Sequence, residues 1–325
     1  MNETADDDAQ RELTAAGLSC DRAASMATVT TFRLGGPCRA LITCQDPDSL
    51  ITATAILRKR GLPYMLIGGG SNLLVSDHGL DCYVLRYVCD SPDIRIVGDR
   101  LSVTGGSILD AVTKFAAEAG LAGIVNTSGI PGTVGGAIVG NAGAFGWQVG
   151  DALEKVRLLA ADGSVREASC AELGFSYRHS DLKDTGEIVL DATFLLQQGV
   201  AKELIAKRRE LLDLRAGKHP NLQQDPCAGS FFRNIEPTSA AERRQASGWF
   251  LEQCNAKEMR VGGAGVYPKH ANIIVNAGDD CRAQDVFDLS QKMAASVKEK
   301  FGFDLVREVR PTGQFKGLES NGKSR

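Results

Sequence analysis

Short apolar runs broken by glycine dominate the chain between residues 33 and 196. Runs of this kind, rich in Val, Ile, Leu and Tyr and bounded by turn-forming residues, are typical of β-strands. They predict strands at residues 40–44, 64–67, 73–75, 83–88, 101–103, 156–160 and 188–196. Residues 47–59 and 107–119 instead carry apolar positions at helical spacing. Strands interrupted by single helices predict two small α+β subdomains.

The pattern changes after residue 200. Residues 201–214 are rich in charge and predict a helix at a domain boundary, and a stretch of turn formers follows at 215–226. The remaining pattern predicts helices at 246–254 and 283–301 and strands at 271–276 and 305–309. The last third of the chain therefore has its own alternation of helix and strand, followed by a polar end.

Composition narrows the class of protein. A chain of 325 residues with 43% hydrophobic residues can bury a large core in two or three domains. Its net charge of −3 gives no reason to expect a nucleic-acid partner. The sequence has no apolar run of membrane-spanning length, and its acidic, polar start is unlike a secretory signal. We therefore expect a cytoplasmic protein with no membrane segment.

The cysteines and histidines support the same expectation. The nine cysteines are scattered and form no Cys-x-x-Cys pair, which is typical of a reduced, intracellular protein. The four histidines have no clustered ligand spacing, so we expect no metal.

The first of two glycine clusters follows the predicted strand at 64–67. It consists of Gly68, Gly69, Gly70, Ser71 and Asn72. Three glycines let several backbone N–H groups point at one anion, and the next two side chains add hydrogen bonds. A strand-like run follows, whereas a dinucleotide fingerprint opens a helix. The cluster predicts either a phosphate cradle or a glycine-rich turn without a ligand.

The second cluster spans residues 128–136, so it begins 56 residues and ends 64 residues after Asn72. Its candidate cofactor-lining residues are Ser128, Gly129, Ile130, Pro131, Gly132, Thr133, Gly135 and Gly136. Little side-chain bulk and one fixed proline φ angle predict a rigid, irregular backbone that a flat ligand can approach closely. A packed structural loop is the alternative. Two such clusters in one chain favour a large, phosphate-bearing cofactor.

These clusters belong to a longer series of motifs. The others lie at residues 31–37, 176–180, 228–234, 248–253, 269–272 and 308–313. In this order and spacing they resemble the UDP-N-acetylenolpyruvoylglucosamine reductase family, flavoenzymes of bacterial peptidoglycan synthesis. The resemblance covers about residues 28–315. Only residues 179–186 separate the arginine motif from the next strand, so the chain resembles the shorter branch of the family, which lacks a tyrosine-bearing loop.

The resemblance implies an α+β fold. A vanillyl-alcohol-oxidase (PCMH-type) FAD-binding fold of two subdomains would be followed by a C-terminal α/β substrate domain. The expected divisions are a disordered lead-in (1–27), two FAD-binding subdomains (28–92 and 93–200), a substrate-binding domain (201–315) and a polar tail (316–325). FAD would bind non-covalently, with its pyrophosphate on residues 68–72 and with residues 128–136 lining it.

The implied reaction is a two-step reduction. NADPH reduces FAD, and the enolpyruvyl ether of a UDP-sugar then takes a hydride on its β-carbon and a proton on its α-carbon. The family motifs place Arg178 and Glu308 at the substrate carboxylate and make Ser230 the proton donor, while Tyr177 and Asn234 contact substrate. Without the resemblance, each is an ordinary residue: an ion-pairing arginine, a turn serine, an edge-strand glutamate.

Two other functions compete with this one. An FAD oxidase of an alcohol or sugar would share the fold, although no His or Cys is evidently placed for covalent flavin attachment. A binding protein with a degenerate flavin fold would have lost the cofactor. The partners expected from the resemblance are the UDP-sugar and NADPH, and we expect a monomer. Cys227, beside the Ser230 motif, would be open to oxidation if it were exposed.

Overall fold

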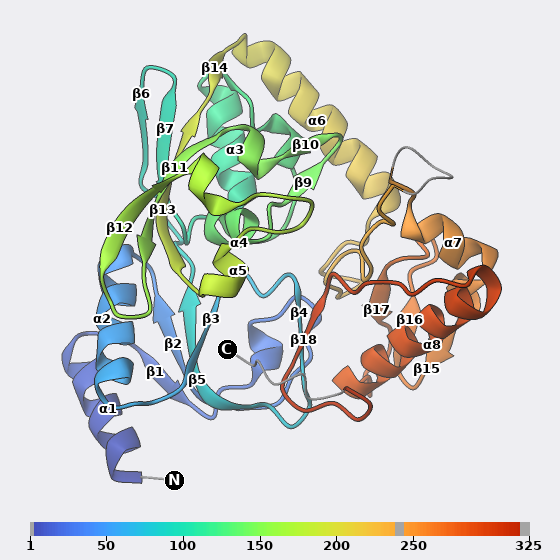
Figure 1. Cartoon of the computed structure of the whole chain (residues 1–325), viewed down its shortest axis with the longest axis horizontal. Helices are drawn as coiled ribbons and strands as arrows, with labels where there is room; N and C mark the ends of the chain where they lie inside the picture. Colours follow the sequence, from blue (N-terminus) through green and yellow to red (C-terminus); the bar gives the residue numbers. More distant parts are fainter. Residues whose placement is uncertain (1–2, 238–243, 319–325) are drawn as a thin grey trace.

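Figure 1 shows the computed structural model of the chain, which describes residues 3–237 and 244–318. The first part is a four-stranded sheet in the order β1 (Cys20–Arg22), β2 (Cys38–Cys44), β5 (Leu80–Tyr87) and β3 (Tyr64–Ile67). β2, β5 and β3 are parallel, and β1 runs antiparallel to β2. Helices α1 (Glu3–Ala15) and α2 (Pro47–Lys59) pack together beside this sheet (Figure 1).

Alternation along the strands explains why this sheet is covered on both faces. Ile42 and Leu85 lie in the cluster that α2 completes with Leu50 and Leu57. The intervening Val84 belongs to a second cluster on the other face. The predicted helix at 47–59 is confirmed to the residue, and a capping box in which Asp46 Oδ1 accepts from the Ser49 N–H at 2.7 Å fixes its start.

The N-terminal segment differs from the prediction. Residues 1–27 were expected to be disordered, but α1 covers residues 3–15, and β1 pairs with β2. The reason is that Ala9 and Leu13 are fully buried against α2, while the acidic side faces polar partners: the Tyr83 hydroxyl donates to Asp6 Oδ1 at 2.8 Å. The acidic composition of this segment therefore led the prediction to miss the narrow apolar stripe of α1.

The second part is an antiparallel five-stranded sheet. Its order is β12 (Val165–Ser169), β11 (Leu153–Leu159), β13 (Ile188–Leu195), β7 (Arg100–Thr104) and β6 (Ile94–Val97). Helices α3 (Leu109–Glu118), α4 (Val134–Val139) and α5 (Leu182–Thr185) accompany it, with two small ribbons: β8 (Leu121–Ala122) with β14 (Gln197–Gln198), and β9 (Gly143–Ala144) with β10 (Trp147–Gln148). Its core is a separate cluster of buried residues drawn from 101–196.

Helix α6 (Ala201–Lys218) connects this part to the last one and lies along α3 (Figure 1). The third part contains α7 (Ser247–Gln253), α8 (Ala283–Phe301) and a small sheet of β15 (Arg260–Val261), β16 (Ala264–Val266) and β17 (Ile274–Asn276). The predicted helix at 283–301 is confirmed; its buried stripe includes Val286, Phe287 and Met293. Short 3₁₀ turns occupy residues 26–28, 125–127, 149–151, 170–173 and 256–258.

The chain end returns to the first part. β18 (Arg310–Thr312) pairs in parallel with β4 (Leu73–Val75), the strand directly after the first glycine cluster. The predicted strand at 305–309 is therefore misplaced. Those residues run beside the segment around Phe231 instead: the Arg233 N–H donates to the Val306 carbonyl at 2.8 Å, and the Glu308 N–H to the Phe231 carbonyl at 2.8 Å.

Two further predictions concern the polar tail and the domain boundaries. Of the predicted polar tail, residues 319–325 lie outside the described residues, and the predicted boundaries at 92, 200 and 315 stay predictions. In the described ranges, 3–237 and 244–318, every helix is too short or too polar to cross a membrane.

Candidate active site

Arg178 lies in a tight turn that ends just before α5. Ser176 and His179 exchange two backbone hydrogen bonds, of 3.1 and 3.2 Å, so that Tyr177 and Arg178 form the turn. Arg178 has a φ of +57°, a left-handed conformation that turns usually assign to glycine. An arginine at this position indicates that its side chain is needed where the turn places it.

The guanidinium of Arg178 points at Glu308. Its Nε donates to Glu308 Oε1 at 2.7 Å, and its Nη2 donates to the Gly143 carbonyl at 2.8 Å. Both side chains of the pair are about three-quarters shielded, with 24% and 23% of their surface exposed. A guanidinium has five N–H donors, so these two contacts leave donors for a ligand anion.

The segment that carries Ser230 lies beside Glu308. The next residue, Phe231, accepts from the Glu308 N–H at 2.8 Å and donates to the Asn272 carbonyl at 2.7 Å. The Asn272 side chain holds Phe232 from both sides, accepting at 2.9 Å and donating at 2.8 Å. The structure therefore brings Arg178 and Glu308 into direct contact, and joins the segment that carries Ser230 to them through backbone.

The two predicted substrate contacts also meet. The Asn234 N–H donates to the Tyr177 hydroxyl at 3.3 Å, although their sequence positions are 57 apart. The Arg244 guanidinium lies 4.0 Å from the centroid of the Tyr177 ring, a stacking distance for a cation on an aromatic face. Tyr177 and Asn234 thus join the arginine turn to the C-terminal part at the edge of the site.

The two glycine clusters pack directly against each other. A Cβ on Gly68 would lie 2.4 Å from Thr133 Oγ1, and one on Gly69 would lie 3.2 Å from the Cα of Gly132. The Ser71 hydroxyl donates to the Pro131 carbonyl at 3.1 Å. Backbone thus meets backbone where a side chain on either cluster would separate them.

The backbone donors of the two clusters differ. In the part of the chain that the structure describes, the N–H groups of Gly69, Gly70 and Ser71 donate to no protein acceptor. In the second cluster, the Gly135 N–H donates to the Gly105 carbonyl at 2.7 Å and the Gly136 N–H to Thr133 Oγ1 at 3.3 Å. Free N–H groups on the first cluster fit an anion such as a pyrophosphate.

A carboxylate supports the second cluster. Asp110, on α3, accepts from the Gly129 N–H at 2.6 Å and from both terminal nitrogens of Arg208 on α6, at 2.6 and 2.7 Å. Burial opposes ionisation of Asp110, but the hydrogen bonds from Arg208 and Gly129 outweigh it, and the pKa of the carboxyl is lowered. This cluster is thus tied to the helices behind it.

The second cluster also contains regular structure. It was expected to be irregular throughout, but α4 begins at Val134, with Thr133 as its N-cap. The prediction missed the helix because Gly135 and Gly136 are poor helix formers on their own.

Comparison with known proteins identifies two regions of the chain. The family described as "FAD binding domain" matches residues 38–169, and the family described as "UDP-N-acetylenolpyruvoylglucosamine reductase, C-terminal domain" matches residues 220–312. A UDP-N-acetylenolpyruvoylglucosamine reductase of Alkaliphilus metalliredigens is 35% identical over 88% of this chain and 90% of its own length. The chain belongs to the UDP-N-acetylenolpyruvoylglucosamine reductase family.

Other relatives agree with this assignment. A reductase of the same description from Bacillus pumilus is 36% identical over 89% of this chain and 92% of its own length. The crystal structure of UDP-N-acetylenolpyruvylglucosamine reductase (MurB) from Thermus caldophilus superposes with a TM-score of 0.75 at 31% identity, covering 91% of this chain and all of that one.

Membership in the UDP-N-acetylenolpyruvoylglucosamine reductase family confirms the predicted resemblance and the α+β fold class, with an FAD-binding domain and a distinct C-terminal domain. The protein is a reductase of peptidoglycan precursor synthesis. The residues present fit FAD, because the N–H groups of Gly69, Gly70 and Ser71 donate to no acceptor among the described residues, and the second cluster packs against the loop that carries them. Asn72 links this loop to the predicted catalytic residues: its Nδ2 donates to the Glu308 carbonyl at 3.1 Å.

Sequence reasoning missed one cation of the site. Lys183, in α5, donates from Nζ to the Arg178 carbonyl at 2.6 Å. Partial removal from water, together with the nearby charges of Arg233 and Arg310, lowers the pKa of Lys183 to about 8, while Glu308 opposes this. A lone lysine in a polar run carries no periodic signal, so only its place in the fold reveals the contact.

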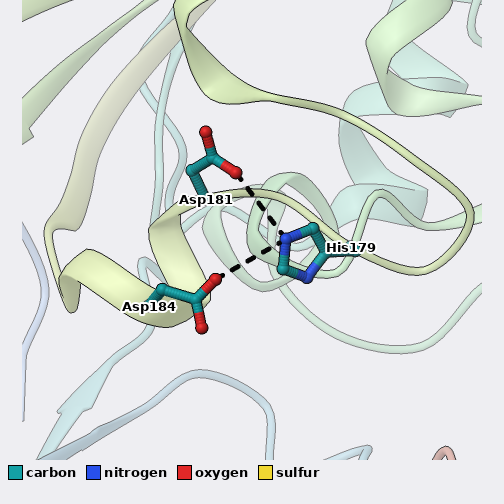
Figure 2. Close-up of side chains that lie close together, drawn as sticks. All are labelled: His179, Asp181 and Asp184. Atoms are coloured by element: carbon teal, nitrogen blue, oxygen red, sulfur yellow. Dashed lines mark ion pairs between the residues drawn. The ribbon is translucent and has the colours of Figure 1, made fainter.

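Figure 2 shows His179 between the carboxylates of Asp181 and Asp184. The imidazole Nε2 lies 3.7 Å from an oxygen of each. These atoms are close enough together to hold a metal ion, although the sequence predicts none. The carboxylates are 59% and 77% exposed, and exposed acidic groups that lie close together are common on protein surfaces without a metal ion.

Two residues near the Ser230 segment are structural. Cys227 is buried, with 1% of its surface exposed, and burial raises the pKa of its thiol to about 11, so the condition for its oxidation is not met. All nine cysteines are free. His270 accepts from the Asn272 N–H at Nδ1, at 3.2 Å, and burial lowers its pKa. It therefore stabilises the segment that clamps Phe232.

Proposed function

We propose that the protein reduces the enolpyruvyl group of UDP-N-acetylglucosamine enolpyruvate to give UDP-N-acetylmuramate, with NADPH as electron donor. The observation that carries the proposal is the Arg178–Glu308 pair, held beside the Ser230 segment and joined by Asn72 to the glycine cradle. The reaction takes place in the cytoplasm, and the protein acts as a monomer.

FAD, when bound, accepts electrons from NADPH and supplies the hydride that forms the new C–H bond at the β-carbon of the substrate. The chain's own part begins with binding. The N–H groups of Gly69, Gly70 and Ser71 hold the pyrophosphate of the cofactor, and residues 128–136 line it. Tyr177 and Asn234 contact the substrate at the edge of the site.

The remaining residues manage charge and the proton. As the β-carbon gains a hydride, negative charge grows on the α-carbon and in the adjacent carboxylate. The free donors of Arg178 stabilise this charge, and Glu308 aims the guanidinium at it. The Ser230 hydroxyl gives its proton to the α-carbon, which completes the second new C–H bond. Hydride and proton together saturate the double bond.

An anaerobic two-step experiment tests this function. NADPH should bleach the oxidised flavin, and the enolpyruvyl sugar nucleotide should restore its visible absorbance. Ser230→Ala should keep the first step and slow the second by about 10³-fold, the size typical for loss of a proton donor. Ser296→Ala is the matched control, because the Ser296 hydroxyl donates to the Met293 carbonyl within its own helix, α8.

Two results would overturn the proposal. If the reduced flavin reacts with oxygen but not with the enolpyruvyl substrate, the protein is an oxidase. If the substrate step is as fast in Ser230→Ala as in the wild type, Ser230 is not the proton donor.

A further inference from the structure

The turn that carries Arg178 needs contacts from outside the turn to keep its backbone conformation. In the turn that Ser176 and His179 close with two backbone hydrogen bonds, Arg178 has a positive φ of +57°, a conformation in which a side chain is strained. Such a conformation persists only when its surroundings hold it in place. The side-chain contacts of Arg178 fix the guanidinium, but they do not by themselves hold the backbone that bears it.

Lys183 supplies the missing contact. Its ammonium donates to the Arg178 carbonyl at 2.6 Å, at the point where the turn leaves the strained residue. A charged donor makes this bond stronger than one between neutral groups. The lysine therefore acts on the backbone of Arg178, not on its guanidinium.

The base from which Lys183 extends is firmly anchored. Leu182 beside it is buried in the core of the second part. The Ser180 hydroxyl donates to the Val139 carbonyl at 2.8 Å, and the Asp181 N–H donates to the Leu173 carbonyl at 2.9 Å. Since α5 cannot shift easily, the position of its lysine sets the position of the turn.

The charges around Lys183 make this contact sensitive to protonation. Burial lowers the pKa of the ammonium most, the charges of Arg233 and Arg310 from the C-terminal part and of Arg178 lower it further, and Glu308 raises it. The titratable groups of its own segment are His179, Asp181 and Asp184, and the His179 Nε2 lies 3.7 Å from an oxygen of each carboxylate. Lys183 forms no salt bridge with any residue in the ranges 3–237 and 244–318. The Arg178 carbonyl is thus the main fixed partner of the Lys183 ammonium.

We propose that Lys183 is a positioning residue, whose ammonium holds the Arg178 turn in the left-handed conformation that presents the guanidinium to Glu308 and to the substrate carboxylate. The part that concerns the substrate rests on the proposed function. Loss of the proton from Lys183 removes the charge that strengthens the contact, so the substrate step slows at pH values above about 8.

Three variants test the proposal. Lys183→Met keeps the length of the side chain and removes its donors, Lys183→Arg keeps a cation that stays protonated, and Lys114→Met alters an exposed lysine of α3 as the matched control. The rate of flavin reoxidation by the enolpyruvyl substrate is measured between pH 6 and pH 10, beside the rate of flavin reduction by NADPH.

We expect Lys183→Met to slow the substrate step by about tenfold or more at neutral pH, as loss of a charge-assisted hydrogen bond does, and to abolish its decline at high pH. Lys183→Arg should restore most of the rate and extend it to higher pH. Reduction by NADPH should be unchanged in all three variants. A His179→Gln variant should keep the wild-type alkaline decline.

A second readout does not depend on activity. Hydrogen exchange of the amides of residues 176–186 should be faster in Lys183→Met than in the wild type or in Lys114→Met. If exchange and rate are both unchanged in Lys183→Met, or if Lys183→Arg declines at the same pH as the wild type, the proposal is wrong. Failure of the wild type to react with the substrate would instead contradict the proposed function, while the exchange result would still decide the role of Lys183.

Discussion

The two glycine clusters look alike in sequence and differ in what their backbones do. The first leaves the N–H groups of Gly69, Gly70 and Ser71 unpaired among the described residues, whereas the second donates to Asp110, to the Gly105 carbonyl and to its own N-cap. Glycine thus serves two purposes in one site. In the first cluster it exposes donors for an anion, and in the second it lets a helix and a loop approach closely from behind.

The difference explains why neither cluster alone identifies a cofactor site. A glycine cluster whose backbone N–H groups are all hydrogen-bonded serves close packing. A cluster whose N–H groups have no protein acceptor needs a rigid neighbour to hold its backbone in place. Gly68 and Gly69 touch Thr133 and Gly132, so the satisfied cluster serves as that neighbour. Single substitutions test this difference between the clusters, and the one with the largest expected effect is in the first cluster.

Gly70→Ala should be the most damaging. The new Cβ would lie 2.0 Å from the Val29 carbonyl oxygen, at a φ of +62°, so both the backbone and its neighbour must move. We expect a loss of stability of about 3 kcal/mol or more and no measurable FAD binding. Thermal unfolding and a flavin titration check this.

Gly61→Ala is the matched control for that variant. Gly61 has nearly the same φ, +63°, but a Cβ there would meet nothing within 4 Å. Only the conformational cost of about 1 kcal/mol should appear, with FAD affinity unchanged. Equal losses in the two variants would mean that the close contact with Val29 has no role.

Asp110→Asn should have an intermediate effect. The substitution removes the charge that orders both Arg208 and the Gly129 N–H, for an expected loss of about 2 kcal/mol. Because the pKa of this carboxyl is lowered in the folded protein, its stabilisation is present above the unfolded pKa of about 4 and is lost as the pH falls through the folded value. Denaturant unfolding from pH 7 down to pH 3 should therefore show a shallower acid loss in Asp110→Asn.

The control for this effect is Asp93→Asn. Asp93 forms the same kind of pair with Arg95, but in full contact with solvent. Its replacement should leave the stability at neutral pH unchanged. If Asp110→Asn behaves in the same way, the second cluster does not depend on the support of α3 and α6.

The smallest effects should come from a pair of Gly→Ala changes, one in each cluster. Gly136→Ala places a Cβ at 3.4 Å from Thr133 Oγ1, an ordinary contact within α4, and should stabilise the protein by about 0.5–1 kcal/mol. Gly69→Ala pushes against the Cα of Gly132 at 3.2 Å and should weaken FAD binding by about tenfold, or about 1.4 kcal/mol. Flavin titrations of both variants check the contrast, which is contradicted if Gly136→Ala weakens binding as much as Gly69→Ala.

Segments with local signals could be predicted closely. The bounds of α2 and α8 were predicted to the residue because each has a strong apolar stripe and a distinct start. The strands at 64–67 and 73–75 were also predicted with their observed bounds, between glycine and turn residues. By contrast, α1 was missed because its two buried residues contact α2, far along the chain. The last strand, β18, was predicted at the wrong residues because its partner β4 lies more than two hundred residues away in the sequence.

The candidate site likewise combines features that the sequence predicts with contacts that appear only in the fold. The sequence by itself determined which residue types are present: two glycine clusters, an arginine turn, a serine segment and a closing glutamate, in an order that resembles one family. The contacts come from the tertiary structure alone: Arg178 meets Glu308, the first cluster keeps its donors free among the described residues, and Lys183 donates to the Arg178 carbonyl. Composition and spacing act over a few residues, whereas these contacts join segments that only the packing of the hydrophobic cores brings together.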